Sequence, residues 1–144
     1  MTEVFFYSNV PNISEFIPRL INKIFFLRRS AVISVMDYSI ARELTKKIWG
    51  FEETSFLAHT DTKAGAAYSP FIFDDKPSAH HNDILINLKD EIPDGFSSFS
   101  RLVEIVPTEP NMRRNSRKKF SWLVERGYSI KVIDLAKGNS QDSR

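Results

Sequence analysis

Short apolar runs alternate along this chain with longer segments whose apolar residues recur every three or four positions. The runs are rich in β-branched and aromatic residues, as buried strands are, and they cover 4–7, 31–36, 71–73, 84–88, 102–106 and 128–135. Where strands alternate with helices, right-handed crossovers place the strands parallel in one sheet. The sequence therefore predicts an α/β fold of Rossmann-like topology, with a mainly parallel central sheet and helices on both faces.

Two of the intervening helices carry distinct signals. In the first helix Leu20 and Ile24 share one face, and Pro18 is expected near the first turn, where a missing N–H is best tolerated. The last helix is expected over about 111–126, with Gly127 closing it.

No repeat, linker or change of composition divides the 144 residues, and this length suits one compact domain with its own core. We expect a single domain over 1–138 and a disordered polar tail over 139–144. Segments 54–68 and 74–82 are expected to be connecting loops. The first ten residues have no basic stretch before a long apolar run, which predicts a cytoplasmic protein without a signal peptide or a membrane span.

The usual chemistry of an α/β enzyme is not visible in the sequence. The turn after the first strand, 8–12, holds no glycine that would let the backbone approach a phosphate, and the chain has no G-x-x-x-x-G-K motif. There is no cysteine, and His59, His80 and His81 do not have the spacing of a metal site. We therefore expect no cofactor, no metal and no catalytic residues.

The last helix holds the most informative cluster of charges. Five basic residues crowd seven of its positions, although the net charge of the chain is only +2: Arg113, Arg114, Arg117, Lys118 and Lys119. On a helix, Arg113, Arg117 and Phe120 lie along one face. Guanidinium groups beside an aromatic ring suit a ligand that is both anionic and apolar, such as a carboxyl-terminal peptide tail that ends in an apolar residue.

Two other interpretations of this cluster stay open from the residues alone. The helix can simply present a solvated basic face while Phe120 packs into the core. The cluster can also bind the phosphates of DNA or RNA, since grouped Lys and Arg side chains are the usual footprint of such binding. Against nucleic acid, Glu109 and Glu125 lie near the helix ends, and no aromatic residues alternate with the charges to stack on bases.

Three stretches of the sequence resemble successive signature segments of one bacterial protein family. They are KKIWGFEETSFLAH (46–59), NDILINLKDEIPDGFSSFSRLVEIV (82–106) and RKKFSWLVERGYSIKVIDL (117–135). In this order and spacing, over about residues 3–135, they resemble the chi subunit of the DNA polymerase III clamp loader. The resemblance implies a small protein without catalytic activity that pairs with the psi subunit. It also implies binding to the acidic, phenylalanine-ended tail of single-stranded DNA-binding protein, with direct nucleic-acid contact weak or absent.

The resemblance further implies which residues bind that tail. The tail site of the family combines a tryptophan, an apolar residue, basic side chains and an aromatic ring, which correspond here to Trp49, Val106, Arg113, Arg117 and Phe120. Arg117, supported by Arg113, is expected to pair with the terminal carboxylate. Trp49, Val106 and Phe120 are expected to receive the terminal phenylalanine.

A second partner surface is implied near the middle of the chain. Phe56 matches an exposed phenylalanine of the family that is associated with docking psi or a helicase. The sequence departs from the family here, because Ala58 stands where a proline often precedes the histidine, and 60–82 follows no family pattern. A core phenylalanine under the loop is an equally open interpretation of Phe56.

Overall fold

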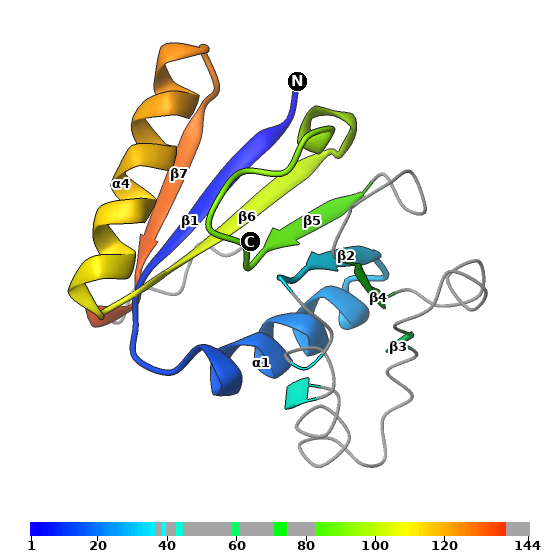
Figure 1. Cartoon of the computed structure of the whole chain (residues 1–144). Coiled ribbons are helices and arrows are strands. Elements are labelled where there is room, and N and C mark those ends of the chain that lie inside the picture. Colours follow the sequence, from blue (N-terminus) through cyan, green and yellow to red (C-terminus); the bar gives the residue numbers. More distant parts are fainter. Residues whose placement is uncertain (37–38, 40–42, 45–58, 61–70, 75–82, 138–144) are drawn as a thin grey trace.

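The computed structural model describes residues 1–36, 39, 43–44, 59–60, 71–74 and 83–137. In this part of the chain seven strands form one sheet in the order β3-β4-β2-β5-β6-β1-β7 (Figure 1). The strands are β1 (Glu3–Val10), β2 (Ala31–Ser34), β3 (His59–Thr60), β4 (Phe71–Asp74), β5 (Ile84–Asn87), β6 (Arg101–Pro107) and β7 (Ile130–Asp134). Every pair of neighbouring strands is parallel, which confirms the expected α/β sheet.

The two long helices cover opposite faces of this sheet. α1 (Ile13–Phe26) packs on one face and α4 (Pro110–Glu125) on the other (Figure 1). Successive residues of β1 point to opposite faces, so Phe5 joins the core beneath α1, whereas Val4 and Phe6 join the core beneath α4. This arrangement confirms the expected helices on both faces. Among the described residues, no helix is long and apolar enough to cross a bilayer.

Three local expectations were wrong. Pro18 is the sixth residue of α1 rather than part of its first turn, because Asn12 starts the helix earlier by accepting the N–H of Glu15 at 3.2 Å. The 54–68 segment, expected to be a loop, contains the short strand β3, and β4 extends to Asp74, which was also expected in a loop. Both strands depend on pairing with distant parts of the chain, which local sequence does not reveal.

The ends of α4 follow from local chemistry. Glu109 caps the helix, since its carboxylate accepts two backbone N–H groups of the first turn at 3.0 and 2.9 Å, and Pro110 occupies the first helical position. At the other end Gly127 adopts a φ of 85° and donates its N–H to the carbonyl of Val124 at 3.0 Å. The helix therefore begins and ends within one residue of the predicted 111–126.

Two short 3-10 helices are also present: η1 (Phe96–Ser98) before β6 and η2 (Leu135–Lys137) after β7. The boundary of the predicted domain at 138 and the predicted tail over 139–144 lie outside the described residues. Both stay predictions.

Candidate functional site

A small pocket lies between the first half of α4 and the strands β1, β6 and β7. Its volume is about 160 Å³, and it is lined by Phe6, Ser8, Val106, Arg113, Ser116, Arg117, Phe120 and Val132. Four of the five residues expected to bind a peptide tail therefore meet around one pocket: Val106, Arg113, Arg117 and Phe120. The fifth, Trp49, lies outside the described residues, and so does Phe56.

The apolar part of the pocket is built from aromatic and β-branched side chains. The rings of Phe120 and Phe6 meet edge to face, with 5.4 Å between their centroids. Phe120 is only partly buried, and it packs against the core beneath α4 while also lining the pocket. Val132 lies beside it with 51% of its surface exposed. Phe120 can therefore both pack against the core, as one interpretation of the sequence expects, and form part of a binding site.

The charged rim of the pocket consists of two arginines one helical turn apart. Arg113 is half-buried and Arg117 is exposed. Within the described part of the chain, neither guanidinium group forms an ion pair or a side-chain hydrogen bond. Both groups can therefore bind an anion without first breaking an interaction with another described residue. A ligand with a carboxylate beside an apolar side chain fits this combination of rim and wall.

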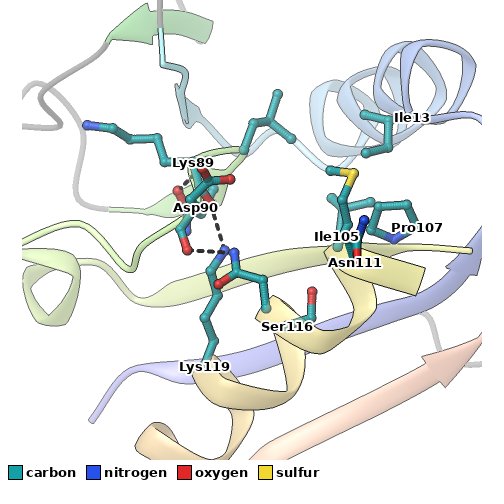
Figure 2. Close-up of a pocket in the computed structure, with 12 residues that line it drawn as sticks. Ile13, Lys89, Asp90, Ile105, Pro107, Asn111, Ser116 and Lys119 are labelled. Carbon is teal, nitrogen blue, oxygen red and sulfur yellow. Dashed lines mark hydrogen bonds between the residues drawn. The ribbon is translucent and has the colours of Figure 1, made fainter. Parts of the chain in front are cut away.

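Lys119 does not belong to this exposed cluster, so the five basic residues of α4 do not all remain available to an anionic ligand. Its side chain is only 10% exposed, and its Nζ lies 3.0 Å from Oε1 of Glu104 on β6. Nζ also donates to the carbonyl oxygen of Lys89 at 2.7 Å, and Figure 2 shows Lys119 pointing from α4 toward Lys89. Lys119 therefore holds the helix on the sheet and is not available to a ligand.

Glu104 is the buried partner of this pair, with 1% of its side chain exposed. Both of its oxygens are satisfied, because Oε1 accepts from Lys119 and Oε2 accepts from Nδ2 of Asn87 at 2.7 Å. Burial raises the pKa of the Glu104 carboxyl above its ordinary value, while the charge of Lys119 and the two hydrogen bonds act in the opposite direction. The sequence signal for this buried pair is the position of Glu104 inside the apolar run 102–106.

A second and larger pocket lies at the carboxyl ends of β5 and β6, between α4 and the start of α1 (Figure 2). Its volume is about 480 Å³, and it is lined by Ile13, Asn87, Leu88, Lys89, Asp90, Ile105, Pro107, Asn111, Met112, Asn115, Ser116 and Lys119. Open α/β sheets commonly bind ligands at this edge.

Several polar groups of this second pocket are already bonded within the protein. Nδ2 of Asn115 donates to the carbonyl oxygen of Asp90 at 2.8 Å, and Nδ2 of Asn87 donates to that of Glu91 at 3.1 Å. Asn115 and Lys119 thereby tie α4 to the segment after β5, whereas the Asn87 bond lies within β5 and that segment. Within the described ranges, no group of three or more metal-binding side chains occurs in this pocket or elsewhere. The smaller pocket, where two arginines have no ion-pair partner among the described residues, is therefore the stronger candidate for binding.

The sequence did not point to four residues that line the smaller pocket: Phe6, Ser8, Ser116 and Val132. Phe6 on β1 pairs with Val132 on β7, and β1 also pairs with β6 on its other side. These neighbours are far apart in the sequence, so only the order of strands brings them beside α4. No local sequence signal marks Val132, because its exposure and its place on the edge strand β7 follow from the order of strands in the sheet.

Comparison with known proteins places these observations in a family. Residues 1–131 match the family model described as DNA polymerase III chi subunit, HolC. The chain is 33% identical over 94 residues to the DNA polymerase III subunit chi of Pseudomonas aeruginosa; the match covers 65% of this chain and 66% of that protein, just under two thirds of its length. It is 24% identical over 110 residues to the subunit chi of Haemophilus influenzae, covering 74% and 76% of the two chains. The subunit chi of Escherichia coli K12 is 24% identical over 105 residues, which is 71% of each chain.

Proposed function

Because this chain belongs to the DNA polymerase III chi subunit family, we propose that it is a non-catalytic adaptor of bacterial replication. In this proposal it binds the acidic carboxyl-terminal tail of single-stranded DNA-binding protein in the cytoplasm and links that protein to the clamp loader through psi. The observation that carries the tail-binding part is the pocket beside α4, in which arginines free of ion pairs in the described structure stand next to an apolar wall.

The proposed recognition divides between charge and shape. Arg117, supported by Arg113, pairs with the terminal carboxylate and a neighbouring aspartate, because guanidinium groups bind carboxylates through two parallel hydrogen bonds. Val106 and Phe120 receive the terminal phenylalanine ring, and Trp49 completes the apolar wall. The pocket volume of about 160 Å³ is below the roughly 300–1,000 Å³ typical of small-molecule sites, which suits a single side chain of a peptide.

Calorimetric titration with a short acidic peptide ending in Asp-Ile-Pro-Phe tests this function. We expect binding that is lost when the final phenylalanine is removed and strongly weakened by Trp49→Ala or Arg117→Ala. Arg19→Ala is the matched control, because it removes the same charge from an exposed position on α1. No binding of the intact peptide, or equal binding with and without the final phenylalanine, would contradict the proposed function.

Direct binding of DNA or RNA is the second candidate, and the basic residues outside the core favour it. Arg113, Arg114, Arg117 and Lys118 form no ion pair within the described residues. This function predicts an affinity for single-stranded oligonucleotides that falls steeply with salt and depends about equally on these four residues. An oligonucleotide that fails to bind at low salt would exclude it.

The second partner surface is part of the same proposal. Phe56 docks psi or a helicase, as the resemblance to the family implies. Copurification of psi with Phe56→Ala tests this assignment. Undiminished recovery of psi with the variant would exclude Phe56 from the interface with psi.

A further inference from the structure

An open groove continues from the candidate pocket along the outer side of α4. Its volume is about 430 Å³, and it is lined by Arg114, Arg117, Lys118, Ser121, Trp122 and Glu125. Arg117 lines both this groove and the smaller pocket, so the two hollows share a wall. We propose that the groove binds the acidic residues that precede the terminal phenylalanine of the tail, with Arg114 and Lys118 as their cationic partners. This inference rests on the proposed function.

Helix geometry places the cationic side chains in a row. Arg114, Lys118 and Trp122 recur every four residues, so they lie along one face of α4. From Arg113 to Trp122 the helix rises by roughly 13 Å at about 1.5 Å per residue. An extended peptide covers that distance with about four residues. A tail whose last residue sits in the pocket therefore brings its preceding residues alongside Arg114 and Lys118.

The charges of the groove are available to such a segment. Arg114 and Lys118 are exposed, and within the described structure neither forms an ion pair or a side-chain hydrogen bond. Glu125 is the acidic residue of the groove and lies at its far end, where Arg126 approaches it to 4.0 Å. The middle of the groove is therefore positively charged. Carboxylates of a bound peptide would lower the repulsion between the neighbouring cations Arg114 and Lys118.

The surroundings of Trp122 favour an acidic peptide over a nucleic acid. The guanidinium group of Arg126 lies over the Trp122 ring at 3.8 Å from its centroid, and Phe96 meets the ring edge to face at 6.0 Å. Binding of single strands relies on aromatic faces that are open to stack on bases. Here Arg126 already covers one face of the Trp122 ring, which leaves less of the ring for a base. Arg114 and Lys118 can pair with the carboxylates of a peptide without any stacking.

Two peptides of equal length test the inference. Both end in Asp-Ile-Pro-Phe; four aspartates precede this ending in one peptide and four asparagines in the other. We expect the double variant Arg114→Gln/Lys118→Gln to weaken binding of the aspartate peptide about five- to tenfold, as two exposed ion pairs allow. Binding of the asparagine peptide is expected to change less than about twofold, because that peptide brings no carboxylates to the groove.

The matched control is Arg19→Gln/Lys23→Gln, which removes two charges at the same spacing from α1 on the other face of the sheet. It is expected to leave both affinities unchanged, and circular dichroism checks that both double variants are folded. If the groove variant weakens both peptides equally or neither, the inference is overturned while the proposed function stands. If neither peptide binds the unmodified protein, the proposed function fails and this inference fails with it.

Discussion

Lys119 of α4 and Glu104 of β6 form an ion pair with 3.0 Å between Nζ and Oε1, and both side chains are almost fully buried. The pair lies on the side of α4 that packs on the sheet, together with the fully buried Leu123. With Lys119 turned into the protein, its neighbour Lys118 faces solvent, and Arg117 and Phe120 border the pocket over β1 and β7. The side of α4 that packs on the sheet thus decides which basic side chains remain available to a ligand.

Replacing Lys119 by Met is expected to lower the free energy of unfolding by about 3 to 5 kcal/mol near neutral pH, because it leaves Glu104 buried without a counter-charge. Urea denaturation followed by circular dichroism measures this loss. Lys118→Met is the matched control, since it removes the same charge from the exposed neighbouring position. An equal effect of the two substitutions would show that the ion pair does not stabilise the fold.

The loss caused by Lys119→Met is expected to depend on pH. Burial holds the pKa of Glu104 above its unfolded value near 4.5, so the stability linked to this group falls as pH rises from that value through the folded pKa. Without Lys119 the folded pKa moves higher still, because the favourable charge is gone. The difference in free energy of unfolding between the variant and the unmodified protein should therefore be smallest near pH 5 and largest near pH 8. Denaturation curves at both values test this, and a loss that shrinks with rising pH would contradict it.

Val132→Glu is expected to weaken binding of the Asp-Ile-Pro-Phe peptide about tenfold, or about 1.4 kcal/mol. The new carboxylate would stand in the wall of the pocket and repel the terminal carboxylate of the tail. Val124→Glu is the control, because Val124 is equally exposed, at 52% against 51%, but does not line the pocket. Calorimetric titration with the peptide measures the affinity of both variants. Equal affinities of the two variants would show that Val132 does not belong to the site.

Arg117→Ala is expected to reduce the affinity for the same peptide by at least about 1.5 kcal/mol, the order of a charge-assisted hydrogen bond. The loss should shrink at high salt, because Arg117 is exposed and its charge is screened. Titrations at two salt concentrations measure both effects. An unchanged affinity at low salt would exclude Arg117 from the site.

Asp83→Asn is expected to lower the free energy of unfolding by about 1 to 2 kcal/mol at neutral pH. Asp83 accepts hydrogen bonds from the guanidinium group of Arg29 and from the backbone N–H of Ser30, which join the entries of β2 and β5. Partial burial acts to raise the pKa of Asp83, but these bonds and the charges of Arg29 and Arg101 outweigh it and hold the pKa below its ordinary value of 3.8.

Because this folded pKa is lowered, the stability that Asp83 contributes is present above about pH 4 and is lost as pH falls through the folded pKa. The difference between the Asp83→Asn variant and the unmodified protein should therefore vanish in acid. Glu3→Gln is the control, since the Glu3 partner of Arg101 is 63% exposed and its loss should cost little. Denaturation at pH 7 and pH 3 separates the two cases, and a difference that is undiminished at pH 3 would contradict the assignment.

The family resemblance of the sequence was confirmed, and so was the parallel sheet with helices on both faces. Other expectations required more than local signals. Pro18 was expected near the first turn of α1 but is its sixth residue, because the capping of the helix by Asn12 was not recognised. The strand β3 was missed because its two residues are too few to show a strand pattern. The placement of Trp49 and Phe56 lies outside the described residues, and their roles stay predictions.

By itself the sequence determined the alternation of helices with all the described strands except β3, the ends of α4 and the alignment of Arg113, Arg117 and Phe120 on one helix face. These properties depend on periodicity and on caps within a few residues. Only the tertiary structure decided that Lys119 is buried while Lys118 is exposed, and that Val132 completes the pocket. The physical reason is that burial and pocket walls depend on what lies opposite a side chain, and here the opposite residues come from strands distant in the sequence.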